Sequence, residues 1–296
     1  MSLAFLYAGQ GSQHPGMGAD LYEAHPAFRA VLDAAGVDFD LKTTMFTDPD
    51  GVLNLTEYTQ PCMVAFAAGM TALLAERGIV PDYAAGLSLG EYSALHAAGV
   101  FDARTAIELV AFRGKVMAEA VKDRPCSMAA ILKLDREALR QCCEAASFLG
   151  VAEIANYNCP GQLVISGEIP AVEAACEAAK AAGARRALRL PVGGAFHSPL
   201  MEPAREELAR AIAETDFHAP VCPVYQNVST HAETDPETIK KNLIAQLTAP
   251  VKWTQSVRNM VADGATVFVE VGPGKVLQGL VKKIEPSVEA YSATIE

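Results

Sequence analysis

The sequence lacks the cysteine patterns that would indicate a metal site or a disulfide framework. Its 296 residues include seven cysteines, but no Cys-x-x-Cys pair and no Cys/His group with zinc-ligand spacing. Cys142 and Cys143 are adjacent, which suits thiols that pack in a core. We therefore expect reduced cysteines, no bound metal and a cytoplasmic location. Cys62, in an expected helix start, is the one thiol that we consider as a reactive group.

Positive charge is also scarce. The chain has 24 Lys and Arg residues against 35 Asp and Glu residues, a formal net charge of -11. This balance disfavours nucleic acid and anionic membranes as partners, and an acidic protein partner would need a local basic patch. The first apolar run, residues 3–8, has no basic flank and is too short for a signal peptide or a membrane span. We expect a monomer that makes no membrane contact.

Complete phosphate-binding motifs are missing as well. In the segment that begins at Gly9, His14 stands where a dinucleotide fingerprint needs its third glycine. The spacing from Gly11 to Gly16 fits a P-loop, but Met17 replaces the lysine. We therefore expect no nucleotide-hydrolysis site.

What the sequence does contain is an alternation of short apolar strands with longer helices. At 51% hydrophobic residues, it has ample material for a core. The alternation predicts an α/β fold with a mostly parallel sheet covered by helices. Strands are expected at residues 3–8, 79–85, 224–228 and 266–271, and helices at 60–76, 89–98, 102–122, 199–214, 239–247 and 251–262.

The pattern changes near Arg124 and Pro125. From there the expected order is β-α-β-β-α-β, which matches a ferredoxin-like unit. Its strands are expected at residues 127–132, 151–156, 162–166 and 184–190, and its helices at 135–146 and 170–182. We therefore predict a small subdomain, residues 125–194, inserted into a larger domain formed by residues 1–124 and 195–296.

The segment around Ser88 is the strongest functional signal. Gly86, Ser88 and Gly90 form a Gly-x-Ser-x-Gly motif between an expected strand and an expected helix. A serine at such a tight turn presents its hydroxyl clear of the backbone, next to the amide donors of a helix N-terminus. We interpret Ser88 as a nucleophile; the alternative is a surface serine in a glycine-rich turn.

A nucleophilic serine needs a base, and His197 is the best placed of six histidines. It follows two glycines and precedes Ser198 and Pro199, a typical helix start. Its ring should be free in a loop, where a nearby helix N-terminus disfavours the imidazolium. The acid of a Ser-His-acid triad is not evident, so a backbone carbonyl or an amide is left to orient the ring. The alternative is a histidine with a capping role only.

Arg113 lies among apolar residues at helical spacing. Leu109, Val110, Val116 and Met117 are its neighbours one turn away. A guanidinium on such a stripe needs a partner. It is either a structural ion pair or a fork for a substrate carboxylate.

Four segments together resemble the malonyl-CoA:acyl carrier protein transacylase family of bacterial fatty-acid synthesis. They are residues 7–13 (Tyr-Ala-Gly-Gln-Gly-Ser-Gln), 86–94 (Gly-Leu-Ser-Leu-Gly-Glu-Tyr-Ser-Ala), 194–198 (Gly-Ala-Phe-His-Ser) and 270–277 (Glu-Val-Gly-Pro-Gly-Lys-Val-Leu). The resemblance covers nearly the whole chain and implies an α/β-hydrolase-like large domain with an inserted ferredoxin-like subdomain. Leu87 departs from the family, in which a histidine often precedes the serine.

The resemblance also implies roles for residues. Ser88 would carry the acyl group as an ester, and His197 would act as base and then acid. The main-chain carbonyl of Gln246 would orient the histidine, and Arg113 would hold the malonyl carboxylate. The other implied substrate contacts are the backbone amides of Gln10 and Leu89 as an oxyanion hole, together with Met117, Phe196, Asn158 and Gln162. No cofactor is implied, because CoA and phosphopantetheine enter as parts of the substrates.

An acidic acyl carrier protein would need positive charge at its docking site. Arg185, Arg186 and Arg189 form a local basic cluster on the insert, and Lys275, Lys282 and Lys283 are further candidates. The alternative is a solvated charged face. Three other functions remain open: a serine hydrolase or thioesterase, a binding module without activity, and a transacylase of a polyketide pathway.

Overall fold

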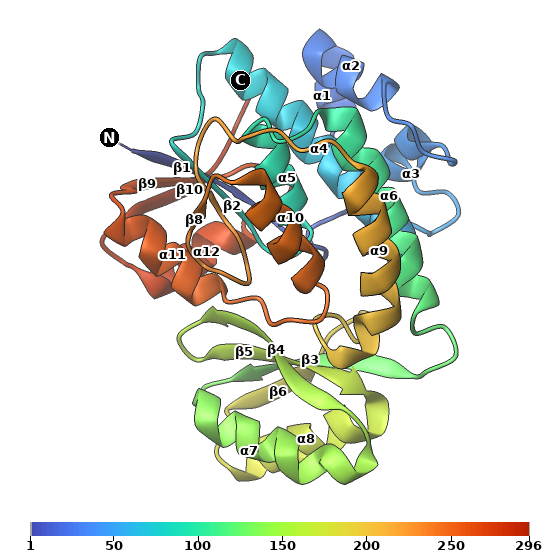
Figure 1. The fold of residues 1–296 in the computed structure, drawn as a ribbon, viewed down its shortest axis with the longest axis vertical. Coiled ribbons are helices and arrows are strands. Elements are labelled where there is room, and N and C mark those ends of the chain that lie inside the picture. The colour runs from blue at the N-terminus through green and yellow to red at the C-terminus, as the bar shows by residue number, and fades with distance from the viewer. Residues whose placement is uncertain (1, 296) are drawn as a thin grey trace.

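A six-stranded sheet forms the centre of the larger part of the molecule in this computed structural model, which describes residues 2–295 (Figure 1). The strand order is β10-β9-β1-β2-β7-β8, and every neighbouring pair is parallel except β7 and β8. The prediction of a mostly parallel sheet is therefore confirmed. The strands are β1 (Leu3–Tyr7), β2 (Tyr83–Gly86), β7 (Val224–Tyr225), β8 (Ala232–Glu233), β9 (Val267–Glu270) and β10 (Glu289–Ser292).

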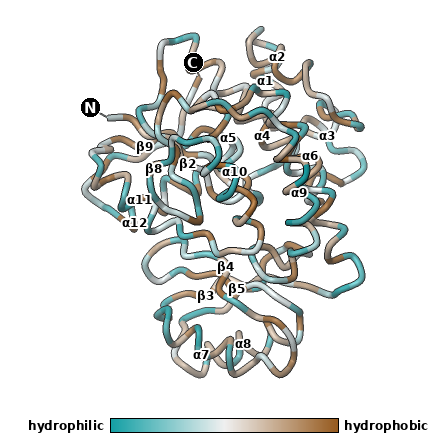
Figure 2. The backbone as a smooth tube through the Cα atoms, viewed as in Figure 1, coloured by the Kyte–Doolittle hydropathy of each residue, from teal (hydrophilic) through white to brown (hydrophobic). Residues whose placement is uncertain are grey.

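Helices cover this sheet, and one of them runs through the core. Figure 2 shows both hydrophilic and hydrophobic residues along α9 (Glu202–Glu214), as in an amphipathic surface helix. The helices of the larger part are α1 (Ala19–Ala24), α2 (Pro26–Asp33), α3 (Leu41–Phe46), α4 (Thr56–Glu76), α5 (Gly90–Ala97), α6 (Ala103–Glu119), α9 (Glu202–Glu214), α10 (Pro236–Ala245), α11 (Trp253–Ala262) and α12 (Val276–Ile284), with a short 3₁₀ turn at Pro199–Met201.

Helix α4 differs from the prediction. It begins at Thr56 rather than at Gln60, so Pro61 lies inside it. Proline has no backbone N–H, so the helical hydrogen bond from residue 61 to the carbonyl oxygen of Glu57 is absent from the second turn of α4, close to its N-terminus. By length and composition alone α4 could cross a membrane, but 78% of its apolar window is buried within the molecule. It is packed as a core helix.

The inserted segment forms a second, antiparallel sheet of four strands in the order β4-β5-β3-β6. The predicted β-α-β-β-α-β order is confirmed. Figure 1 shows α7 and α8 on the face of this sheet that points away from the larger part. The elements are β3 (Cys126–Leu132), α7 (Arg136–Ala146), the 3₁₀ turn Ser147–Leu149, β4 (Ala152–Cys159), β5 (Gln162–Glu168), α8 (Ile169–Ala181) and β6 (Arg186–Arg189).

Two hydrophobic cores follow from this arrangement. Ile131 and Ile165 pack under α7 and α8, whereas Met128 and Val164 join the core of the larger part. One face of the small sheet therefore packs against α7 and α8, and the opposite face packs against the larger part. A backbone seam adds to this contact, since Tyr157 N donates to Val251 O at 2.9 Å and Val251 N donates to Ala155 O at 2.8 Å. The domain limits at residues 124/125 and 194/195 remain a prediction.

Some expected strands are shorter than the apolar runs that suggested them. The run at residues 79–85 yields a strand only from Tyr83, and Ile79 and Val80 are 40% and 61% exposed. The strand expected at residues 224–228 ends at Tyr225, because Gln226 and Asn227 turn into a buried polar network. The helices between residues 19 and 46, α12 and β10 have no counterpart among the predicted elements.

Candidate functional site

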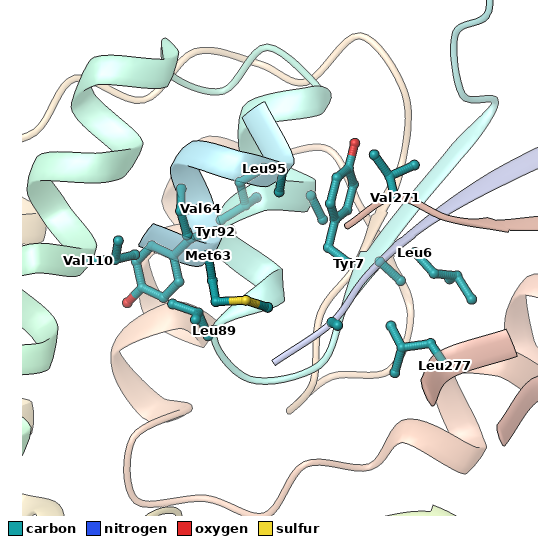
Figure 3. Packing of buried hydrophobic residues seen from close by; sticks show 14 of the residues in the cluster. Leu6, Tyr7, Met63, Val64, Leu89, Tyr92, Leu95, Val110, Val271 and Leu277 are labelled. Carbon is teal, nitrogen blue, oxygen red and sulfur yellow. The ribbon is translucent and has the colours of Figure 1, made fainter. Parts of the chain in front are cut away.

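Ser88 sits on a sharp turn between β2 and α5. Its φ of 53° lies in the left-handed region, which a non-glycine residue rarely adopts. Two glycines make the turn possible: a Cβ on Gly86 would lie 1.9 Å from the carbonyl carbon of Gly90, and one on Gly90 would lie 2.0 Å from the carbonyl oxygen of Tyr7. The flanking segment is fixed by packing, and Figure 3 shows Leu89 beside Met63 in the core. The sequence therefore folds locally into a nucleophile elbow.

His197 faces Ser88 across the site. Its Nε2 lies 2.7 Å from Ser88 Oγ, and its Nδ1 lies 2.8 Å from the main-chain oxygen of Gln246. Because a carbonyl can only accept, Nδ1 carries the hydrogen and Nε2 is left to accept the serine proton. A backbone carbonyl thus occupies the place that an acid fills in a Ser-His-acid triad.

The histidine is held neutral by its surroundings. Only 4% of its surface is exposed, and this burial, followed by the positive charge of Arg113, lowers the pKa of His197 to about 4. The ring stands at the start of the Pro199–Met201 turn, which Ser198 caps. A base that is neutral at physiological pH can accept a proton as soon as the serine attacks.

Arg113 is buried within hydrogen-bonding distance of Ser88. Its Nη2 donates to Ser88 Oγ at 3.3 Å and to Gln246 Oε1 at 3.2 Å, and its Nη1 donates to Gln60 Oε1 at 2.8 Å. The guanidinium also lies 5.4 Å from the centre of the Tyr92 ring. Its Nε is buried with no partner among the described residues, and its hydrogen bonds all go to uncharged side chains. Arg113 itself does not line the cavity over Ser88, so its role in binding a carboxylate stays a prediction.

A cavity of about 250 Å³ opens over Ser88 between the two sheets. Asn158 forms part of its wall, and Oδ1 of this side chain is buried without a hydrogen-bond partner in residues 2–295. Met117 does not line the cavity; its Sδ accepts a hydrogen bond from Gln60 Nε2 at 3.4 Å, so it lies behind the site. The predicted residues that do line the cavity are Gln10, Ser88, Asn158, Gln162, Phe196 and His197.

The backbone amides of Gln10 and Leu89 are the predicted donors of an oxyanion hole. Gln10 lines the same cavity as Ser88, and Leu89 follows Ser88 at the entry to α5. Neither amide donates to an acceptor elsewhere in the described chain. The side chain of Gln10 is turned aside, because its Nε2 donates to Thr56 Oγ1 at 3.3 Å. Their role as donors to an oxyanion stays a prediction.

The basic residues of the insert separate into two groups. Arg185 and Arg186 line a hollow of about 330 Å³, and Gln162 lines both this hollow and the cavity over Ser88. Arg189 instead lies 3.6 Å from Glu173 on α8 and does not line that hollow. Lys275 precedes α12 and lines neither space.

Sequence reasoning missed three polar residues that surround the site: Gln60, Glu91 and Asn227. All three are buried, and each hydrogen-bonds to a functional residue or to the elbow. Asn227 had a usable signal, since polar residues that directly follow a buried parallel strand lie at the edge of the sheet where sites form. Gln60 and Glu91 stand within apolar helices and gave no local signal.

Comparisons with known proteins agree with this geometry. The family model described as "Acyl transferase domain" matches residues 4–295. The malonyl CoA-acyl carrier protein transacylase of Bacillus subtilis is 45% identical over 295 residues, which cover 99% of this chain and 93% of that protein.

Solved structures give the same result. An acyl carrier protein S-malonyltransferase from Vibrio cholerae superposes with a TM-score of 0.96 at 42% identity, covering 100% of this chain and 98% of the other. A malonyl-transacylase solved in complex with a type II polyketide synthase acyl-carrier protein also gives 0.96, at 40% identity and 99% and 96% coverage. The chain belongs to the acyl transferase domain family, as a member of its malonyl CoA-acyl carrier protein transacylases.

Proposed function

We propose that the chain transfers a malonyl group from malonyl-CoA to the phosphopantetheine thiol of an acyl carrier protein, through an ester on Ser88, and so supplies extender units for fatty-acid synthesis. The observation that carries the proposal is the convergence of two groups on one oxygen. His197 Nε2 lies 2.7 Å and Arg113 Nη2 lies 3.3 Å from Ser88 Oγ. One group suits the proton of the serine, and the other suits a carboxylate next to it.

The reaction proceeds in two halves. Ser88 Oγ attacks the thioester carbonyl while its proton passes to His197 Nε2, and the amides of Gln10 and Leu89 stabilise the oxyanion. The tetrahedral intermediate then expels the CoA thiolate, which takes the proton from His197 and leaves the malonyl ester on Ser88. In the second half the pantetheine thiol gives its proton to His197 and attacks the ester, and Ser88 leaves with that proton.

Arg113 links substrate choice to the base. The malonyl carboxylate would pair with its guanidinium, which has no ionic partner in the described chain. The positive charge of Arg113 contributes to the lowered pKa of His197. A bound carboxylate offsets that charge, so the imidazole becomes a better proton acceptor when malonyl is in place. An acetyl group leaves the charge uncompensated.

The cavity offers an approach for the pantetheine arm. Asn158 Oδ1 is an unused, buried acceptor in its wall, and Gln162 stands where the cavity meets the basic hollow. An acceptor of this kind suits an amide N–H, of which the arm carries two. The arm would enter past Gln162 and place its thiol above Ser88.

The acidic carrier protein would dock at the mouth of this approach. Arg185 and Arg186 share the hollow with Lys133 and Lys283, and no acidic residue within 2–295 lines it. The four cations form a local basic patch on a chain of net charge -11. Exposed Lys241, on α10, is a matched control position for charge reversal.

We also propose that the protein acts as a monomer in the cytoplasm. Ser88, His197 and Arg113 all come from one chain, so a monomer holds a complete site. All seven cysteines are free, which suits the reducing cytoplasm.

Separate assays of the two halves test the proposed function. Incubation with malonyl-CoA should give a malonyl adduct by intact mass, and holo acyl carrier protein should then remove it and become malonylated. The apo carrier protein, which has no thiol, is the matched control and should leave the adduct in place. Rapid release of free malonate without a carrier would contradict a transferase and indicate a thioesterase. The absence of any adduct would indicate a binding module.

A further inference from the structure

Asn227 lies beneath the nucleophile elbow, and its side chain contacts both flanks of the turn. Its Oδ1 accepts the amide hydrogen of Ser88 at 2.6 Å, and its Nδ2 donates to the carbonyl oxygen of Gly86 at 2.6 Å. The residue has no exposed surface. The two bonds therefore form away from water, where losing either would leave a buried backbone group without a partner.

The backbone of Asn227 is itself fixed at both ends. Its N–H donates to Glu91 Oε2 at 2.7 Å, and its carbonyl accepts from the amide of Lys252 at 3.1 Å. Glu91 stands one turn after the nucleophile, and its amide donates to Ser88 O at 3.1 Å. Ser88, Asn227 and Glu91 thus close a ring of hydrogen bonds that starts and ends at the nucleophile.

Neighbouring side chains complete this network. Glu91 is fully buried, and its other oxygen accepts from Gln226 Nε2 at 2.9 Å. Burial raises the pKa of Glu91 to about 7. Gln246 Nε2 donates to Ser88 O at 3.0 Å, so the residue whose carbonyl orients His197 also holds the elbow.

The elbow needs such support, because Ser88 has a φ of 53°. A non-glycine residue in this region is strained and persists only where the surroundings over-determine it. An acceptor must face the Ser88 amide while a donor faces the Gly86 carbonyl. A carboxamide supplies both from one rigid plane, whereas an ionised carboxylate supplies only acceptors.

We propose that Asn227 is a positioning residue for acyl transfer: its carboxamide holds Gly86 and Ser88 so that Ser88 Oγ stays in line with His197 Nε2. This inference rests on the proposed function of Ser88 as the nucleophile. Asn227 lines no part of the cavity over Ser88, so it acts through the elbow rather than on the substrate.

Asn227→Asp and Asn227→Ala test the proposal through the single-turnover rate of Ser88 acylation at saturating malonyl-CoA. We expect both rates to fall about 10- to 100-fold at pH 8, because a displacement of the reacting atom by about 1 Å costs that much. The KM for malonyl-CoA should change less than about threefold, since the carboxylate site at Arg113 is untouched.

The Asn227→Asp variant adds a readout that lost stability alone would not produce. Once protonated, the introduced carboxyl group would again donate to Gly86 O and accept from Ser88 N, so the acylation rate of this variant should rise as the pH falls from about 8 to 5.5. The titratable groups around this position are Glu91 on α5, Arg113 on α6 and His197. His197 can only lose its basic form as the pH falls, which lowers the rate. Glu91 also titrates in this range, since its pKa is raised to about 7, but it does so in the wild type as well. The readout is therefore the rate of Asn227→Asp divided by that of the wild type at each pH, and this ratio should rise as the pH falls.

Asn259→Asp is the matched control. Asn259 Nδ2 donates to the carbonyl of Thr230 at 2.8 Å, so the same kind of bond is lost without any direct hydrogen bond to Gly86 or Ser88. It should lower the thermal unfolding temperature and leave the acylation rate and its pH profile as in the wild type. An Asn227→Asp variant that acylates at the wild-type rate, or that is slow without recovery at low pH, would overturn the proposal. Wild-type protein that forms no adduct would instead refute the proposed function.

Discussion

Replacement of Arg113 tests how the site selects its acyl group. Arg113→Gln removes the charge but keeps a group that can hydrogen-bond to Gln60 Oε1, which reduces the risk of a misfolded variant. We expect the ratio of kcat/KM for malonyl-CoA over acetyl-CoA to collapse. Acetyl transfer should not fall, because acetyl has no carboxylate for the guanidinium to bind and because loss of the positive charge makes His197 a better proton acceptor.

The magnitude follows from burial. Arg113 is 1% exposed, so a malonyl carboxylate paired with it would be largely out of water. Removing one partner of a buried ion pair costs about 3–5 kcal/mol. At 1.36 kcal/mol for each factor of ten, the malonyl-over-acetyl ratio should fall by about 10²- to 10⁴-fold.

The assay compares both thioesters on the same preparation, by the rate of adduct formation on intact protein. Because both rates scale with the folded fraction, their ratio does not depend on stability. Arg104→Ala is the control on the same helix, since Arg104 is exposed and paired only with Glu108. A ratio in Arg113→Gln equal to that of the wild type would refute the assignment of Arg113 to the malonyl carboxylate.

Three further results are expected. The kcat/KM of acylation should stay level between about pH 8 and 6 and decline only toward pH 4. The reason is that the pKa of His197 is lowered to about 4 and protonation removes the base. A decline centred near pH 6.5 would show an unshifted histidine. Reversing Arg185 and Arg186 to glutamate should slow transfer to the carrier protein about tenfold or more at low salt while sparing acylation by malonyl-CoA; equal loss in both halves would count against docking there. Gly90→Ala should lower the free energy of unfolding by more than the roughly 1–3 kcal/mol of ordinary overpacking, since its Cβ would meet a backbone oxygen at 2.0 Å. Thermal unfolding measures this against the control Gly279→Ala, whose Cβ would have nothing within 4 Å, and equal stability of the two variants would contradict the prediction.

The local sequence was sufficient to predict the tight turn at Ser88 and the order of the helices and strands. Glycines at positions 86 and 90 indicate a turn that is too tight for side chains. In the structure, backbone atoms lie about where a Cβ atom on either glycine would be. Helical spacing likewise marked Arg113 as a buried cation, and it is 1% exposed. Such signals are readable because their physical cause lies within a few residues of sequence.

The local sequence could not predict the buried polar residues that hydrogen-bond to the site. Gln60, Asn227 and Glu91 come from segments far apart in the chain, and their hydrogen-bond partners Arg113, Ser88 and Asn227 are brought to them only by the folded structure. The ends of strands were also misjudged, because apolar Ile79 and Val80 are exposed where burial was expected. The sequence predicts a helix start at Pro61, whereas α4 begins at Thr56 and continues through this proline. Each of these depends on tertiary contacts rather than on local preference.

Peptide mapping of the protein after brief incubation with malonyl-CoA tests the central claim most directly. The account predicts one malonyl group on the peptide that carries Ser88, labile to holo acyl carrier protein and absent from Ser88→Ala. A malonyl group on any other residue, or an unmodified Ser88 peptide under these conditions, would contradict it.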